Sequence, residues 1–348
     1  MILVIFLSFQ YNEQVNKKEA GMIYPSFLKQ GSTIGIAAPS AGTGKKVDDY
    51  IRSVQYLESR GFHVKETPSV RVDNDRSADP VTRGKELNSI FLDPKVDMVM
   101  CAAGGDFLDE MIPFADFETM QKHPKWLMGA SDPTGLLYPL TTKYDVATIY
   151  GLNGGSYSFR PVPDFAKNNL EILQGNLIEQ TSWKTILSAL PFGLDHVFYD
   201  KENTWQSDAE TIHAEGRCIG GCIDVLKDLI GTRFDGTKDF LKKYKDDGII
   251  WYFDNFSLSA EVFYRTLLQF RYAGWFDYTK AVIIGRTIFP SSETGMTYEE
   301  ACELALGDYP YVTEADVGHT IPHMTLINGA MLTFDWENHE AKLKFSLK

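Results

Sequence analysis

The chain has 348 residues, of which 34 are lysine or arginine and 47 are aspartate or glutamate, so the formal net charge is −13. This acidic balance argues against nucleic acid or an anionic membrane surface as the main partner, because both are negatively charged. The length suffices for two domains, each with its own core. The proportions of apolar and charged residues are those of an ordinary globular protein.

Few cysteines occur in a chain of this length, which favours reduced thiols and a cytoplasmic protein. Cys218 and Cys222 are spaced C-x3-C, but no histidine pair with matching spacing lies near them. We therefore expect no zinc site there.

Residues 1–21 are predicted to be an N-terminal extension or a disordered tail. Met1 to Phe9 are apolar, yet no basic residue precedes them and no small-residue cleavage site follows. The run is also too short to span a bilayer. A degenerate signal peptide is the alternative, and no membrane partner is expected.

The pattern in residues 22–175 predicts a nucleophile domain built on a doubly wound, mostly parallel sheet. Short apolar runs alternate with stretches of helical spacing, which is typical of this α/β architecture. The expected strands are 33–38, 62–64, 96–102, 126–130 and 147–150, and the expected helices are 47–57, 81–92, about 108–114 and one from 136 onward. Ligands of such sheets bind beyond the carboxyl ends of the strands.

Residues 176–206 are predicted to cross between domains, because they mix proline, aromatic and polar residues without a clean period. Residues 207–348 are predicted to form a C-terminal α/β domain. Its expected strands are 216–219, 248–253, 281–285, 312–317, 325–334 and 342–347. One expected helix ends near 229, and two others span 261–272 and 298–306.

Ser131 is the first candidate for chemistry. The apolar run Trp126 to Ala130 predicts a buried strand, and Pro133 suits the first turn of a following amphipathic helix. A serine at such a sharp strand-to-helix junction has the geometry of a nucleophile elbow, although Pro133 departs from the G-x-S-x-G pattern. The free N–H groups of the helix start could stabilise an oxyanion. The alternative is a serine that only caps the helix.

His319 is the candidate base for Ser131. It follows Gly318 at the end of an expected strand, and the glycine leaves room for close approach. His323 could pair with it as a metal ligand, but Pro322 interrupts a helix there and the Glu of H-E-x-x-H is missing. We expect no metal. The other histidines occupy polar contexts without a partner motif: His63, His123, His196, His213 and His339.

Asp254 is the candidate acid. It stands at the carboxyl end of the apolar run Ile249 to Phe253, and an ionised carboxylate beside such a strand requires a partner. His319 could be that partner. The alternative is that Asp254 merely starts a turn with Asn255.

Taken in order, these segments resemble the serine-type LD-carboxypeptidases, whose relatives include the microcin C immunity hydrolases. The resemblance covers nearly the whole chain from Met22 onward. Its markers are the GSTIGIAAPS run 31–40, the AGG run 103–105, PKWLMGASD at 124–132, Gly220-Gly221 with Gly231-Thr232, AGWF at 273–276 and DVGH at 316–319.

The resemblance implies a Ser–acid–His triad of Ser131, Asp254 and His319, with the nucleophile in the N-terminal domain. It also implies a C-terminal domain with partly barrel-like β character. In this family the acid is a Glu, so Asp254 is one methylene shorter. Ala130 stands where Tyr is usual, and Asp106-Phe107 follows the glycine pair, both expected at the pocket wall.

The expected activity is hydrolysis of an amide bond through an acyl-enzyme, with the backbone N–H groups of Gly105 and Asp132 as the oxyanion hole. By resemblance, the substrate is a muropeptide that loses its terminal D-alanine in peptidoglycan recycling, without metal or organic cofactor. The alternatives are an immunity-type amidase acting on peptidyl-nucleotides and a catalytically inactive muropeptide-binding protein. A homodimer is a further expectation.

Overall fold

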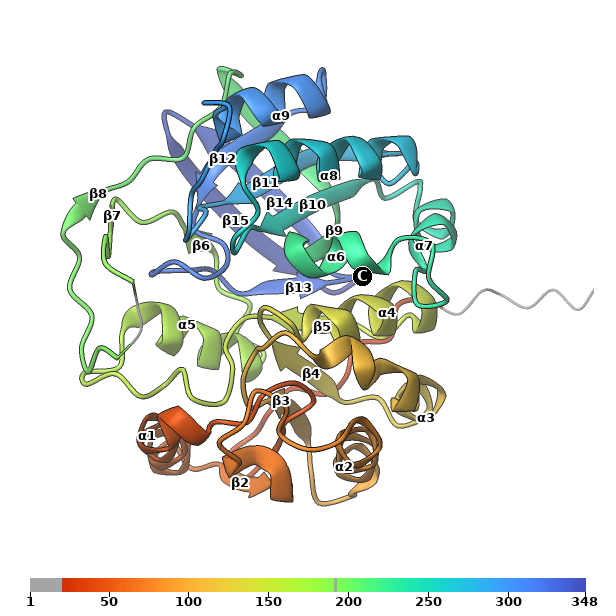
Figure 1. Cartoon of the computed structure of the whole chain (residues 1–348), viewed down its shortest axis with the longest axis vertical. Coiled ribbons are helices and arrows are strands. Elements are labelled where there is room, and N and C mark those ends of the chain that lie inside the picture. Colours follow the sequence, from red (N-terminus) through yellow and green to blue (C-terminus); the bar gives the residue numbers. More distant parts are fainter. Residues whose placement is uncertain (1–20, 191–192) are drawn as a thin grey trace, which may run out of the picture.

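Two β-sheets, one built mainly from each half of the chain, lie one above the other in the computed structural model (Figure 1). The structure describes residues 21–190 and 193–348. Our expectation for residues 1–21 thus falls, except for Gly21, outside the described residues. Among the helices of the described part, none combines the length and the apolar composition needed to traverse a bilayer.

The first sheet has six strands in the order β13-β5-β4-β3-β1-β2. Its first five strands in sequence pair in parallel, as predicted, and all residues of β3 and β4 are buried. Continuous apolar runs form such strands because helices cover both sheet faces. The strands are β1 Thr33–Ala37, β2 His63–Glu66, β3 Met98–Cys101, β4 Trp126–Gly129, β5 Thr148–Tyr150 and β13 Leu326–Asn328.

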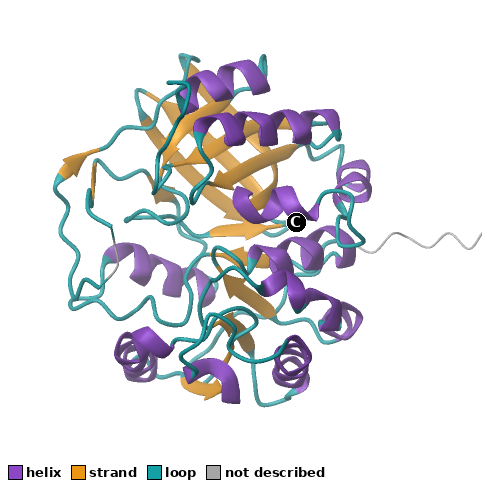
Figure 2. Cartoon of the chain, viewed as in Figure 1, coloured by secondary structure: helices purple, strands orange, loops and turns teal. Residues whose placement is uncertain are grey.

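Helices flank this sheet on both sides, which confirms the doubly wound prediction (Figure 2). They are α1 Val47–Ser59, α2 Pro80–Leu92, α3 Phe117–Lys122, α4 Thr134–Tyr144 and α5 Asp164–Leu173. The helix predicted near 108–114 is wrong: two 3₁₀ turns, Leu108–Glu110 and Ile112–Phe114, stand there. Pro113 lacks an N–H and so disfavours a continuous α-helix. Two further 3₁₀ turns span Gly44–Lys46 and Pro68–Arg71.

The second sheet has seven strands in the order β12-β11-β10-β9-β14-β15-β6. Strands β9 to β12 pair in parallel, and β14, β15 and β6 continue the sheet in antiparallel fashion. Its strands are β6 Gln180–Thr181, β9 Thr211–Cys222, β10 Ile249–Asp254, β11 Thr279–Gly285, β12 Tyr311–Ala315, β14 Met331–Glu337 and β15 Glu340–Ser346. A separate ribbon pairs β7 Thr185–Ile186 with β8 Lys201–Glu202.

The helices of the second half are α6 Ile223–Leu229, α7 Thr237–Lys243, α8 Ala260–Tyr272 and α9 Tyr298–Leu306. The α/β class predicted for this half is confirmed, but its sheet does not close into a barrel, since β12 and β6 form its two edges. Within the described residues the sheet is mixed and open, so the expected partly barrel-like character stops short of a closed barrel. Strong twist lets an open sheet curl without closing.

The strand predicted at 325–334 is two strands that belong to different sheets. Gly329, with φ 86°, breaks the run between β13 and β14. β13 pairs antiparallel with β5 of the first sheet, whereas β14 pairs with β9 of the second. The C-terminal segment therefore joins both halves of the molecule.

Helix α4 lies between the two sheets (Figure 1). All residues from Thr134 to Thr142 are buried, so the predicted amphipathic character is wrong. A helix that is apolar all round belongs inside a protein rather than at its surface. Tyr138 stacks on Trp275 of the second half at 5.4 Å between ring centroids, and its hydroxyl lies 2.7 Å from Thr237 Oγ1. The strand β4 and the helix α4 thus present the residues between them to the second half.

Candidate active site

Ser131 occupies the sharp junction between β4 and α4. Its φ of 69° is left-handed, a conformation that costs energy for a residue with a side chain and that clusters at functional sites. Gly104 makes room for it, because a Cβ on Gly104 would lie 3.2 Å from Ser131 Oγ. Pro133 is the residue at the N-cap of α4, and no side chain caps the helix. The alternative of a capping serine is therefore wrong.

His319 and Asp254 meet at the carboxyl edge of the second sheet. His319 Nδ1 lies 2.8 Å from Oδ2 and 3.0 Å from Oδ1 of Asp254, and the His319 backbone N–H donates to Oδ1 at 3.3 Å. Asp254 ends β10 and is fully buried. Its carboxylate therefore orients the imidazole, and the turn that follows is held instead by Asn255, whose Oδ1 accepts from Leu258 N at 3.0 Å.

Gly318 allows this pair to form. Its φ is 100°, and a Cβ on this residue would lie 1.8 Å from Asp254 Oδ1. No residue with a side chain can therefore hold the backbone so close to the carboxylate. The room that the sequence predicted at Gly318 is confirmed.

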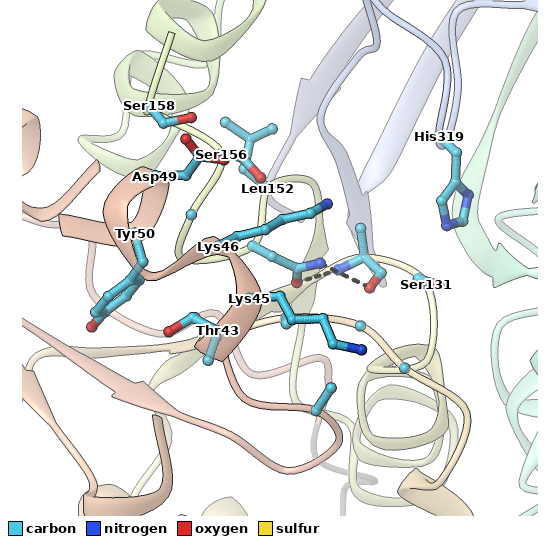
Figure 3. Close-up of a pocket in the computed structure, with 18 of the residues that line it drawn as sticks. Thr43, Lys45, Lys46, Asp49, Tyr50, Ser131, Leu152, Ser156, Ser158 and His319 are labelled. Atoms are coloured by element: carbon cyan, nitrogen blue, oxygen red, sulfur yellow. Dashed lines mark hydrogen bonds between the residues drawn. The ribbon is translucent and has the colours of Figure 1, made fainter. Parts of the chain in front are cut away.

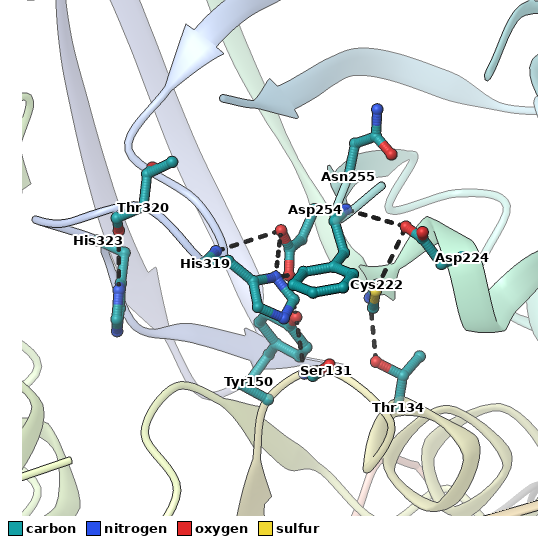
Figure 4. Close-up of polar contacts among 12 residues, drawn as sticks. Ser131, Thr134, Tyr150, Cys222, Asp224, Asp254, Asn255, His319, Thr320 and His323 are labelled. Carbon is teal, nitrogen blue, oxygen red and sulfur yellow. Dashed lines mark hydrogen bonds and ion pairs between the residues drawn. The ribbon is translucent and has the colours of Figure 1, made fainter. Parts of the chain in front are cut away.

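Charge and burial act in opposite directions on the His319 imidazole. Burial lowers the pKa of His319, but the negative charge and the hydrogen bond of Asp254 outweigh it, so the pKa lies above its ordinary value. The ring also packs on Phe256 at 4.6 Å between centroids. In the view of Figure 4 the ring lies between Asp254 and the Ser131 turn, and both His319 and Ser131 line the same cavity.

Tyr150, the last residue of β5, is a site residue that our sequence analysis missed. Its hydroxyl accepts a hydrogen bond from Ser131 N at 3.0 Å and donates to Asp254 Oδ2 (Figure 4). The side chain is buried, and its ring tilts against Tyr252 at 5.6 Å between centroids. The one available signal was its place at the carboxyl end of the strand that follows Ser131.

The backbone N–H groups named for the oxyanion hole stand free beside Ser131. Ser131 N–H is occupied by Tyr150, whereas in the described part of the chain the N–H groups of Gly105 and Asp132 donate no hydrogen bond. The Asp132 side chain accepts from Ser40 Oγ and, at 3.0 Å, from Leu108 N. It therefore ties the loop after β3 to the Ser131 turn, and burial raises the pKa of this carboxyl to about 6.

A cavity of about 480 Å³ opens over Ser131 and His319, a volume that suits a small peptide end or a drug-sized ligand. Lys45 and Lys46 project into it from the start of the chain segment that leads into α1 (Figure 3). Asn153 fixes its floor, since this side chain bonds both to Ala130 N at 3.0 Å and to Ala130 O at 3.2 Å. The lining also includes these aromatic and polar side chains: Tyr50, Phe159, Phe165, Phe256, Asp49, Asp73, Asn74, Asp75, Ser156, Ser158 and His323.

The sequence departs from the family pattern at two places that were both expected at the pocket wall, but only one of them lies there. Ala130 lines the cavity, but Asp106 and Phe107 do not. Arg76 lies over the Phe107 ring at 3.5 Å from its centroid, outside the cavity. The expectation for positions 106 and 107 is therefore wrong, because this part of the loop turns away after Gly105.

His323 does not join His319 in a ligand cluster. Its Nδ1 lies 3.2 Å from Thr320 O, and its ring tilts against Phe165 at 4.9 Å between centroids. Burial lowers the pKa of His323 to about 4. Across residues 21–190 and 193–348, no group of three or more His, Cys, Asp or Glu side chains is arranged to hold a metal ion.

Comparison with known families gives two matches that together span most of the chain. Residues 34–151 match the LD-carboxypeptidase N-terminal domain, and residues 215–334 match the LD-carboxypeptidase C-terminal domain. The chain belongs to the LD-carboxypeptidase family. It is accordingly an enzyme of the serine carboxypeptidase type.

Individual relatives align over nearly their full length. A Vibrio cholerae protein whose name provisionally assigns it to the carboxypeptidases is 26% identical, over 93% of this chain and 98% of that protein. The microcin C7 self-immunity protein MccF of Escherichia coli is 25% identical, over 89% of this chain and 92% of its own.

Solved structures share the fold. MccF in complex with aspartyl sulfamoyl adenosine superposes with a TM-score of 0.78 at 22% identity, covering 94% of this chain and all of that chain. Muramoyltetrapeptide carboxypeptidase from Oxalobacter formigenes superposes with a TM-score of 0.72 at 20% identity, covering 90% and 99%.

Proposed function

We propose that the protein cleaves the amide bond of a terminal D-amino acid in a muropeptide, through Ser131, His319 and Asp254. The observation that carries the proposal is the Asp254–His319 pair, which faces the strained Ser131 across one cavity. A nucleophile, a base and an orienting acid in this order form the arrangement that activates a serine hydroxyl at neutral pH.

In this mechanism His319 Nε2 takes the proton of Ser131 Oγ as the oxygen attacks the scissile carbonyl carbon. The carbonyl oxygen becomes an oxyanion that the N–H groups of Gly105 and Asp132 stabilise. His319 then passes its proton to the leaving amine, and an ester forms on Ser131. Water, deprotonated by His319, attacks the ester carbon. His319 returns this proton to Ser131 Oγ as the ester C–O bond breaks, and the acid is released.

The cations of the cavity support a substrate with a free terminal carboxylate. Lys45 and Lys46 are the lysine or arginine residues that line it among those described, and a released D-amino acid carries its carboxylate two bonds beyond the scissile nitrogen. An ammonium group binds such a carboxylate by charge-assisted hydrogen bonds. All four cysteines are free and buried, which agrees with a cytoplasmic reaction on recycled muropeptides.

An immunity-type amidase acting on a peptidyl-nucleotide is the second candidate. Phe159 and Phe165 are among the residues that line the cavity, and aromatic rings are the side chains on which a base stacks. In this case the same Ser131 chemistry would cleave an amide that links an aminoacyl group to a nucleotide.

Mass spectrometry of a murein tetrapeptide incubated with the wild type and with Ser131→Ala tests the proposal. Loss of one alanine mass with the wild type alone is the expected result. An intact tetrapeptide together with cleavage of an aminoacyl-nucleotide analogue would favour the second candidate. A folded wild type that a serine-directed fluorophosphonate fails to label would instead indicate an inactive binding protein.

A further inference from the structure

We propose that Tyr150 is a positioning residue that sets both the Ser131 turn and the Asp254–His319 pair through one hydroxyl group. The inference rests on the proposed function, because it assigns a role in the activation of Ser131. Tyr150 does not touch the cavity and is not among its lining residues. It acts through Ser131 and Asp254 alone, which its hydroxyl joins.

The direction of both hydrogen bonds is fixed by chemistry. The Ser131 backbone N–H can only donate, and an ionised Asp254 carboxylate can only accept. The Tyr150 hydroxyl must therefore accept from Ser131 with a lone pair and direct its single proton to Asp254. Burial, followed by the charge of Asp254, keeps the pKa of Tyr150 well above its ordinary value, so the hydroxyl retains this proton.

At Asp254, the Tyr150 proton is a third donor besides the two N–H groups of His319. Oδ2 accepts from Tyr150 and lies 2.8 Å from His319 Nδ1, and Oδ1 accepts from His319 Nδ1 at 3.0 Å and from the His319 backbone at 3.3 Å. Donors share the basicity of the carboxylate that they bind, so loss of the Tyr150 donor should strengthen the remaining bonds to His319 and raise the pKa of the imidazole further.

At Ser131, the Tyr150 oxygen satisfies the backbone N–H of a residue held at φ 69°. A buried N–H without an acceptor would favour rotation of the strained peptide away from this conformation. That rotation would carry the Ser131 side chain away from His319. The hydroxyl thus stabilises the conformation in which the nucleophile faces its base.

Tyr150 and Asp254 belong to different halves of the chain. β5 lies in the first sheet and β10 in the second, so the Tyr150–Asp254 bond couples the Ser131 half to the half that carries acid and base. Tyr138 offers a matched control. It is equally buried, and its hydroxyl also reaches the second half, but it contacts Thr237 rather than a residue of the site.

The test compares wild type, Tyr150→Phe and Tyr138→Phe by the rate of fluorophosphonate labelling between about pH 5 and pH 9. The probe reports nucleophile activation without any assumption about the substrate. For Tyr150→Phe we expect labelling about 10- to 100-fold slower, with the midpoint of the acid limb at higher pH. Tyr138→Phe should keep the wild-type rate and midpoint. In an Asp254→Asn background, Tyr150→Phe should slow labelling much less, because the two residues act as one unit.

The outcomes of this test distinguish the positioning role of Tyr150 from the proposed function. Tyr150→Phe labelling at the wild-type rate and midpoint would overturn the positioning role while leaving the proposed function intact. A Tyr150→Phe protein that loses its circular dichroism spectrum, while Tyr138→Phe keeps it, would assign Tyr150 to stability alone. Wild type that is not labelled at all would overturn the proposed function and this role with it.

Discussion

Asp254 reaches His319 although its side chain is short. The backbone of Gly318 comes into contact with the carboxylate, and the imidazole follows one residue later. The acid is thus brought to the base by the path of the loop rather than by the length of the side chain. An Asp, although one methylene shorter than Glu, therefore meets the His319 imidazole from this position.

Asp254→Asn should keep the fold and lower turnover by about three to four orders of magnitude, because the amide no longer fixes the His319 tautomer. Steady-state hydrolysis and circular dichroism measure the two effects. Asp335→Asn is the control, since it removes the carboxylate beside His213 at an exposed site. Turnover unchanged by Asp254→Asn would remove Asp254 from the mechanism.

The pH dependence should follow His319. Its pKa is raised, and the protonated imidazole cannot accept a proton from Ser131, so kcat/KM should fall as pH drops through a midpoint above 6.5. The pH profile of hydrolysis checks this value. A midpoint below 6.5 would show that burial outweighs Asp254.

Lys45→Met combined with Lys46→Met should raise KM for a peptide with a free terminal carboxylate about 10-fold or more, because a charge-assisted bond is lost. The same peptide with a terminal carboxamide should be unaffected, and so should Lys29→Met, which lies outside the cavity. An equal change for both peptides would exclude the lysines from carboxylate recognition.

Three of the site residues could be predicted because each follows a short apolar run, where parallel strands present their carboxyl ends. Tyr150 could not be predicted as a site residue, because it lies within such an apolar run and its pattern indicates a core residue. Only the pairing of β4 with β5 brings its hydroxyl under Ser131. Apart from the place of Tyr150 at the end of its strand, a hydrogen bond between neighbouring strand ends leaves no signature in local sequence.

The loop from Asp316 to His323 depends on a buried network behind it. Arg286 pairs with Asp316 and donates to Pro322 O at 2.9 Å, and Trp205 Nε1 donates to Asp316 at 2.9 Å. This network holds both ends of the loop. His319 therefore stands on a rigid support, although it lies outside any strand or helix.

Gly318→Ala should abolish labelling of Ser131 and lower the free energy of unfolding by about 3 kcal/mol or more, because the new Cβ would overlap Asp254. Chemical denaturation measures the loss. Gly295→Ala is matched in φ, at 85°, but has open space, so it should show the strain alone, about 1 kcal/mol. If both variants lost the same free energy of unfolding, the overlap of the new Cβ with Asp254 would be relieved by small shifts at no cost.

Most strands of the first sheet could be predicted as elements, because fully buried parallel strands are continuous apolar runs. α4 was assigned the wrong character, since a helix buried on every side carries no polar face. The split of 325–334 into β13 and β14 was missed for a related reason. A single glycine marks the turn, and nothing local tells which sheet each part joins.

At the scale of the molecule, the two halves share one continuous core. α4 contacts β5 on one side and β9, α6 and α7 on the other. The sequence indicated two domains, and the buried apolar side chains of both belong to one hydrophobic cluster. The halves should therefore unfold together.

Tyr138→Ala should lower the free energy of unfolding by about 3–5 kcal/mol, because it leaves a cavity against Trp275. Differential scanning calorimetry should still show one transition, shifted to lower temperature. Tyr138→Phe should shift it far less, since the ring remains. Two separate transitions, with only one displaced by Tyr138→Ala, would show that the halves are independent.

The return of β13 to the first sheet has a consequence for synthesis on the ribosome. A nascent chain that ends before Leu326 contains every parallel strand of the first sheet, yet the hydrogen-bonding edge of β5 has no strand to cover it. The strand that ends in Tyr150 is then exposed, and His319 has only just been made. The edge of β5 is thus covered by β13 only after His319 has been synthesised, late in translation.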